Sequence, residues 1–353
     1  MPFSNQKNIL MHDEVGNLHS FQEEKEKIIY TYFDKQLGEY KKEVLIENSS
    51  GEFDASMDEK DLYMVYQNTK GEIILMTFKK GIWYENSLGG DVSLKVFNLN
   101  IVLCTGKVHI VYCVKAQENS MCYRIYHHYC ENQEWRSFVV EDIEIQKFLN
   151  PFQLIDYENK LVIGFYQLIK GYEQIFIKEF DIQKQQWNPS IQLTWSSCEK
   201  LYLNLLMTHE ELIHVTYSSY VDGNLIIKYE KYKLEQDQAI KKIEHILSNP
   251  ANCSYPLFVK EKDKLWTIWT EYDQVVSSFS IDEGITWSEP YLWKESKEIL
   301  FFQYKYYTNY EKIKENYQLC YAFGKAYPEF SFIGFGPLEK AQEIPIKKKR
   351  RYR

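Results

Sequence analysis

One short pattern recurs seven times along the sequence, and this repeat restricts the fold more than any other feature. Each copy is an apolar run that ends in an aromatic residue and is followed by a polar turn. The clear copies are Leu62–Tyr66, Val108–Tyr112, Leu161–Phe165, Ile213–Tyr217 and Leu265–Trp269, with weaker ones at Leu18–Phe21 and Leu319–Phe323. The closing aromatic residues lie 45 to 54 positions apart. Within each copy the apolar period is two, which indicates strands and argues against a helical solenoid.

Strand repeats of this length are typical of β-propeller blades, which are four-stranded sheets. Seven copies predict an all-β, seven-bladed β-propeller of four-stranded antiparallel blades, formed as a single domain by residues 1–346. The expected blades are 7–50, 51–92, 93–144, 145–196, 197–250, 251–296 and 297–346. Two segments could supply the strand that closes the ring, namely Ala341–Ile346 or the N-terminal segment.

Composition agrees with a sheet protein that has a substantial core. Hydrophobic residues make up 44% of the chain, and it contains 29 Tyr, 20 Phe and 8 Trp. Aromatic side chains suit the half-buried surface of a sheet. The same excess could also reflect the codon usage of an AT-rich genome.

A single segment carries a specific motif. Residues 280–287 contain Ser280, Asp282, Gly284, Thr286 and Trp287 in the spacing S-x-D-x-G-x-T-W. This matches the Asp-box at every defined position, in the expected turn between the third and fourth strands of the sixth blade. The chain therefore resembles the Asp-box, or BNR-repeat, propellers, which are sialidase-like in fold and include noncatalytic members. In that group the box is structural: Ser and Asp bond the turn, Gly takes an unusual backbone conformation and Trp packs into the sheet.

The resemblance covers sialidases, other glycoside-acting proteins and lectins, so it does not select one function. A sialidase needs three arginines around the substrate carboxylate. Only Arg124 and Arg136 precede the C-terminal tail, and both fall in the third expected blade. We therefore expect no sialidase activity and assign no catalytic residue. A pair of catalytic carboxylates stays open among the 50 Asp and Glu residues.

No metal or cofactor site is expected. His209 and His214 are one residue too far apart for the helical zinc-protease motif, and they are predicted on a turn rather than a helix. The third expected blade also gathers cysteines and histidines, but without paired metal-binding spacing. The seven cysteines are best explained as reduced thiols, and with no signal-peptide pattern they predict a cytoplasmic protein.

Two segments are candidate contact sites. Tyr304, Tyr306, Tyr307 and Tyr310 could form an exposed aromatic loop that stacks on a sugar or anchors a protein, although alternating core and surface tyrosines explain them as well. The tail Lys347, Lys348, Lys349, Arg350, Arg351 and Arg353 is basic and expected to be disordered. Because the net charge is −8 despite this tail, nucleic acid is an unlikely partner elsewhere on the chain.

These observations support three hypotheses for function. The first is a noncatalytic scaffold that binds a protein partner. The alternative is a carbohydrate-binding or glycoside-acting propeller, which the Asp-box resemblance suggests. A structural protein of a cell or spore surface layer is the third, suggested by the tyrosines and the tail. No run of residues is apolar enough to predict a membrane span.

Overall fold

The structure of the chain is a computed structural model. It describes residues 3–347 except 60, 90–93, 118–119, 132–133, 158–159, 210, 222, 236–237 and 326–329. Of the basic tail only Lys347 lies within this range, so Lys348, Lys349, Arg350, Arg351 and Arg353 are outside the described residues.

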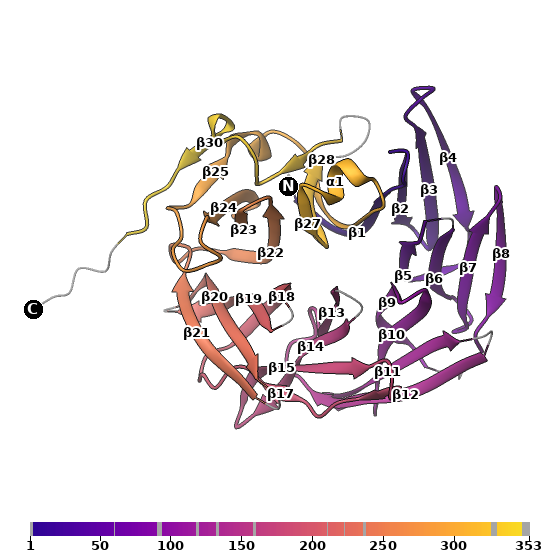
Figure 1. The fold of residues 1–353 in the computed structure, drawn as a ribbon, viewed down its shortest axis with the longest axis horizontal. Coiled ribbons are helices and arrows are strands. Elements are labelled where there is room, and N and C mark those ends of the chain that lie inside the picture. The colour runs from indigo at the N-terminus through magenta and orange to yellow at the C-terminus, as the bar shows by residue number, and fades with distance from the viewer. Residues whose placement is uncertain are drawn as a thin grey trace, which may run out of the picture.

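Six antiparallel blades surround a central channel (Figure 1). In each blade the strands follow one another from the channel outward, and the first strand lines the channel. The first three blades are β1 (Phe3–His12), β2 (Leu18–Glu24), β3 (Lys27–Asp34) and β4 (Glu39–Ile46); β5 (Ser49–Met57), β6 (Leu62–Asn68), β7 (Ile73–Lys79) and β8 (Ile82–Ser87); and β9 (Val96–Cys104), β10 (Lys107–Lys115), β11 (Cys122–Glu131) and β12 (Glu134–Glu144).

The other three blades follow the same plan. They are β13 (Phe152–Tyr157), β14 (Lys160–Ile169) and β15 (Tyr172–Asp181), with the short β16 (Gln186–Trp187) and β17 (Ile191–Gln192) both paired to β15; β18 (Lys200–His209), β19 (Leu212–Val221), β20 (Asn224–Glu235) and β21 (Gln238–Ile246); and β22 (Cys253–Glu261), β23 (Lys264–Glu271), β24 (Gln274–Ser280) and β25 (Tyr291–Trp293).

The expectation of seven blades was wrong, because residues 297–346 do not form a separate four-stranded sheet. Strands β26 (Phe301–Thr308), β28 (Tyr321–Lys325) and β29 (Phe332–Ile333) extend the sheet of the first blade, through a parallel pairing of β26 with β1. The short strands β27 (Tyr317–Leu319) and β30 (Ala341–Glu343) pair instead with β22 and β25 of the sixth blade.

The β1–β26 pairing also answers how the ring closes. Because β26 is hydrogen-bonded to β1, most of the last repeat extends the sheet of the first blade. Its two short strands β27 and β30 pair with the sixth blade instead. Ala341–Glu343 forms β30 on the outer edge of the sixth blade and so does not close the ring. Three short helices, η1 (Lys294–Lys297), α1 (Glu311–Lys314) and η2 (Leu338–Lys340), connect these C-terminal strands.

The core lies between the faces of neighbouring sheets, as the repeat predicted. All seven repeat aromatics are at most 9% exposed, including Phe323 in β28. They pack with Val, Ile and Leu from adjacent blades; one cluster, for example, joins Val111 of the third blade, Phe165 of the fourth and Tyr217 of the fifth. Burial of an aromatic side chain between sheets stabilises each repeat.

Candidate functional site

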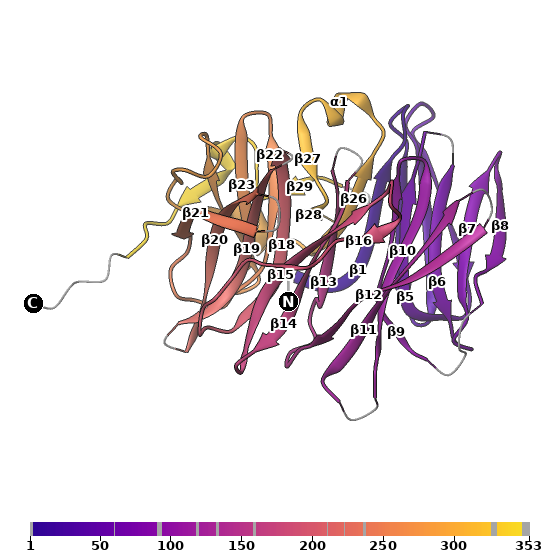
Figure 2. The same cartoon turned by 60° about the horizontal axis from the view of Figure 1, so that its bottom comes forward.

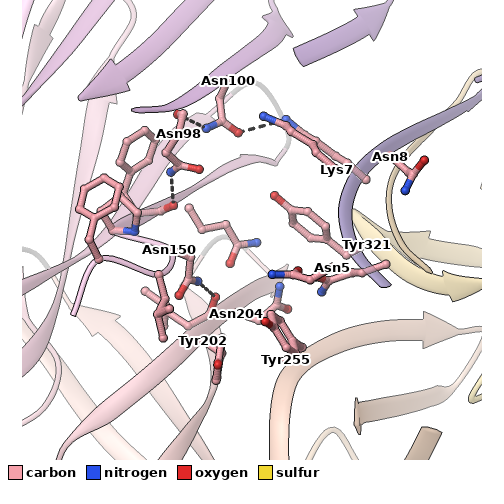
Figure 3. A pocket seen from close by; sticks show the side chains of 18 of the residues that line it. Asn5, Lys7, Asn8, Asn98, Asn100, Asn150, Tyr202, Asn204, Tyr255 and Tyr321 are labelled. Carbon is pink, nitrogen blue, oxygen red and sulfur yellow. Dashed lines mark hydrogen bonds between the residues drawn. The ribbon is translucent and has the colours of Figure 1, made fainter. Parts of the chain in front are cut away.

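A cavity of about 420 Å³ lies at the end of the channel where the inner strands begin. All six blades and the C-terminal segment contribute to its lining. The lining residues are Asn5, Gln6, Lys7, Asn8, Gly51, Glu52, Asn98, Asn100, Phe148, Leu149, Asn150, Pro151, Phe152, Gln153, Tyr202, Leu203, Asn204, Tyr255, Pro256, Gln303, Lys305 and Tyr321. Figure 3 shows the amide groups and the tyrosine side chains of this set surrounding one open space.

Bulges in the inner strands shape the rim of this cavity. The strand register shifts at Gly51, Asn98, Tyr202 and Tyr255, each near the start of an inner strand. Asn98, Tyr202 and Tyr255 have φ between 52° and 57°, a left-handed conformation that residues other than glycine rarely adopt. A bulge re-aims a side chain, and backbone strain of this kind collects at functional sites. Three strained bulges at equivalent places therefore mark this rim as a candidate site.

Carboxamide side chains tie neighbouring inner strands together. Asn98 Nδ2 donates to the carbonyl of Phe152 at 2.9 Å, and Asn150 Nδ2 donates to the carbonyl of Leu203 at 2.8 Å. Both amide groups are thereby held in place with an oxygen left over. Asn150 Oδ1 is buried and has no hydrogen-bond partner among the described residues. An unsatisfied buried acceptor beside a polar cavity can be satisfied by a donor on a ligand.

Two lysines lie on the side of the cavity formed by the first three blades. Lys305 makes a buried ion pair with Asp54, and its Nζ donates to Asn100 Oδ1 at 3.1 Å. Burial opposes the charge of Lys305, but Asp54 together with Tyr321 and Cys320 outweighs it and raises the Lys305 pKa above its usual value. Lys7 donates to the carbonyl of Leu99 at 3.2 Å, and burial lowers its pKa.

Aromatic rings form the opposite side. The rings of Tyr202 and Tyr255 are tilted by 40° with centroids 4.3 Å apart. Burial raises the pKa of Tyr255 above its usual value, so its hydroxyl keeps its proton and can donate a hydrogen bond. The cavity therefore combines hydrogen-bonding groups with aromatic surface in its lining.

The C-terminal segment closes the inner end of the cavity. Lys305 of β26 bonds Asp54 of β5 and Asn100 of β9. Just below, Tyr307 Oη donates to the carbonyl of Ile101 at 3.2 Å, and Gln318 Nε2 donates to the carbonyl of Met207 at 2.9 Å. These bonds connect β26 to the third blade and β27 to the fifth blade. Figure 2 shows α1, which follows β26, at the end of the channel away from the start of β1.

The Asp-box residues lie in the turn between β24 and β25, as expected, and none of them lines the cavity. Asp282 accepts hydrogen bonds from Ser280 Oγ at 2.7 Å, from the Thr286 amide at 2.8 Å and from Thr286 Oγ1 at 2.6 Å. The hydrogen bonds from Thr286 and Ser280 lower the Asp282 pKa to about 2. Gly284 has a φ of +83°, and Trp287 packs on Tyr229 with ring centroids 4.8 Å apart.

The tyrosine segment differs from the exposed loop that one sequence interpretation required. Tyr304 and Tyr306 are 5% and 1% exposed, because they lie on β26 within the closing sheet. Tyr307 is half-buried and bonded to Ile101, while Tyr310 is half-buried and accepts a hydrogen bond from Lys35 at 2.7 Å. None of the four lines the cavity, so the alternating core pattern describes them better.

The other sequence candidates are separate from the cavity. His214 is fully buried, whereas His209 is exposed and pairs with Glu283 at 3.0 Å. His127 is buried against His109 in the third blade, with 3.0 Å between ring nitrogens. Within the described residues no group of His, Cys, Asp or Glu has the arrangement of a metal site, and no helix is long and apolar enough to cross a membrane.

The sequence interpretation missed the asparagines of the cavity. It rested on the second strand of each blade, whereas these residues lie at the start of the first strand. Asn98, Asn150, Tyr202 and Tyr255 recur at intervals of about one repeat, and this periodicity was the available signal.

Comparison with known proteins adds the following. No family model and no curated protein matches the sequence, so the Asp-box resemblance stays a prediction. Among solved structures, the chain is similar to a lectin of Aleuria aurantia described as a six-bladed β-propeller with a novel fucose recognition mode (10% identity, 81% of this chain and 94% of that chain, TM-score 0.47). It is also similar to a protein named AofleA from Arthrobotrys oligospora, with 12% identity over 84% of this chain and 87% of that chain and a TM-score of 0.44. A third similar structure is an ulvan lyase described as a polysaccharide lyase, with 10% identity over 79% of this chain and 77% of that chain and a TM-score of 0.48. At these values no ligand or activity is transferred to this chain.

Proposed function

We propose that the protein binds a carbohydrate in the cavity at the mouth of its channel. The observation that carries the proposal is the combination of carboxamides and tyrosines around one space, with Asn98, Asn150 and Asn204 lining the same cavity as Tyr202 and Tyr255. This is the carbohydrate-binding alternative reached from the sequence, now attached to different residues.

The chemistry of the lining suits a sugar ring. Each carboxamide offers both a donor and an acceptor, which matches hydroxyl groups that also do both. Aromatic rings cover the apolar C–H face of a sugar, and a few fixed polar groups set its orientation. The cavity volume of about 420 Å³ is within the range of small-molecule sites.

Binding without catalysis is the simpler form of this proposal. Asp54 is paired with Lys305, and Glu52 accepts a hydrogen bond from the Leu99 amide at 3.1 Å. Both carboxylates are thus engaged with the protein, which leaves neither free to act as the acid or the base of a catalytic pair. The protein-scaffold and surface-layer hypotheses have no comparably defined site among the described residues.

A panel of immobilised oligosaccharides tests the proposal, followed by titration calorimetry on any glycan that binds. Asn5→Ala and Gln303→Ala are the test variants, since both side chains line the cavity and make no side-chain hydrogen bond within the described part of the chain. We expect each to weaken binding about fivefold or more, the usual loss of about one hydrogen bond, with an unchanged melting temperature. Gln342→Ala, on the outer strand β30, is the matched control and should bind normally. A panel with no binding, or binding that both cavity variants leave intact, would refute the proposal.

A further inference from the structure

The floor of the cavity is a fixed part of the fold. Lys305, Gln303 and Tyr321 line the side that the C-terminal segment provides. Lys305 is 9% exposed and is held by the buried carboxylate of Asp54 and by Asn100. Next to it, Tyr307 bonds a backbone carbonyl of the third blade and Gln318 bonds one of the fifth blade. Side chains of the C-terminal segment therefore lie beyond the cavity, where a polymer threading the channel would have to pass.

The walls of the cavity come from all six blades. Its lining takes residues from β1, β5, β9, β13, β18 and β22, together with the segment leading into β13. Because the lining is arranged around the channel axis, with side chains from several blades around one space, a ligand that contacts several blades together enters along this axis (Figure 3). Only a group that enters along the channel axis reaches the hydrogen-bonding groups of the floor.

The depth of the lining residues indicates how many sugar residues the cavity contacts. The strained residues Asn98, Tyr202 and Tyr255 lie at the start of the inner strands, above Asn100 and Asn204, which are buried deeper along the same strands. The side chains thus form two levels, an outer level that carries the two tyrosines and an inner level of amide groups that ends at Lys305. This arrangement fits one residue at the floor and its neighbour at the rim.

From this geometry we infer that the cavity recognises the terminal residue of a glycan chain and not an internal repeat. This inference rests on the proposed function and adds the class of ligand, namely a chain end inserted along the axis. The hydroxyl groups of a terminal sugar are free around almost its whole edge, and amides from several blades can then bond to it together. An internal residue carries a linkage on both sides, and one of them would meet the wall or the floor.

The test compares glycans that differ only in their ends. For the series that binds in the panel (cello-, chito-, manno-, xylo- or malto-oligosaccharides), calorimetry measures the disaccharide, the hexasaccharide and the polymer, with concentration expressed per chain end. We expect dissociation constants that agree within about threefold across the three, and a stoichiometry of one protein per chain end. For glucans, α-cyclodextrin is the matched probe without ends, and we expect it to bind at least about tenfold more weakly than maltohexaose.

Other outcomes separate the two proposals. Affinity that rises in proportion to the number of internal units, several proteins bound per polymer chain, or equal binding of cyclic and linear glucans would overturn the chain-end inference while leaving carbohydrate binding intact. Failure of every series to bind would instead refute the proposed function on which the inference rests. Gln303→Ala should weaken the disaccharide and the polymer by the same factor, because both place the same residue at the floor.

Discussion

Gly284 makes the Asp-box turn and the fifth blade depend on each other, and Gly284→Ala tests that dependence. Its φ of +83° alone makes alanine unfavourable there, by about 1–2 kcal/mol. An added Cβ would also lie 1.8 Å from Tyr229 Oη, where an ordinary contact begins at 3.4 Å. Tyr229 is fully buried, and its hydroxyl is 2.8 Å from His214 Nδ1, so moving the ring breaks a buried hydrogen bond at a cost of about 1–3 kcal/mol. We expect a total loss of about 2–5 kcal/mol.

Gly171→Ala separates the two contributions. Gly171 has a nearly identical φ of +84°, but nothing lies within 4 Å of an added Cβ. This control should lose only the backbone part, about 1–2 kcal/mol. Urea denaturation followed by tryptophan fluorescence measures both variants, and the m-values should match that of the unmodified protein.

A second variant checks the contact itself. In Tyr229→Phe the atom nearest to the added Cβ is absent, so the further loss caused by Gly284→Ala should shrink. Equal destabilisation by Gly284→Ala and Gly171→Ala, or no coupling between Gly284 and Tyr229, would refute the reasoning.

Three further predictions concern stability and the separation of the box from the cavity. Burial lowers the pKa of His214 to about 3, and the charges of Lys231, Lys260 and His209 lower it further. This histidine therefore stays neutral in the folded protein near neutral pH. Its contribution to the free energy of unfolding is complete above pH 6.5 and is lost as pH falls toward 3. Between pH 7 and pH 5 the free energy of unfolding should drop by about 2 kcal/mol through this group, and urea titrations of His214→Gln should show a correspondingly flatter pH profile; an unchanged profile would contradict the assignment. Lys305→Met leaves the buried Asp54 without its cation and should cost about 3–5 kcal/mol, measured by the same denaturation, and a loss below about 1 kcal/mol would show that the pair is not buried as described. Asp282→Ala should lower the melting temperature but leave the dissociation constant of any bound glycan unchanged, because the Asp-box lies outside the cavity; loss of binding at full stability would make the box part of the site.

The repeat predicted most of the propeller because its signal comes from burial. An aromatic residue at the end of the second strand must pack between two sheets, and all seven such residues do. Burial of the aromatic residues does not give the number of blades. Phe323 is as buried as the other six, although its strand extends the first blade and forms no blade of its own. Which edge β26 pairs with depends on residues about 300 positions away, and local periodicity carries no information on such a pairing.

The site was less predictable for a related reason. The Asp-box motif is visible because its spacing is fixed by one tight turn, whereas the cavity is assembled from short, separate segments of six blades and from the C-terminal segment. Tyr202 and Tyr255 occur in runs that read as ordinary strands, and only the bulges turn them toward the channel. The tyrosines of residues 304–310 were candidates for a contact site because the segment is rich in tyrosine. A high tyrosine content does not distinguish a buried strand from an exposed loop.

The parallel pairing of β1 with β26 has a consequence for how the chain acquires its structure during synthesis. Ile9 pairs with Lys305, so the inner strand of the first blade waits for a partner that is made almost last. At about 5–20 residues per second, roughly 300 residues take some 15–60 s. During this interval the edge of β1 is open while the later blades form, and such an unpaired edge is prone to aggregation. We expect ribosome-bound chains that stop before residue 301 to be the most dependent on chaperones, and the ring to lock in one late step.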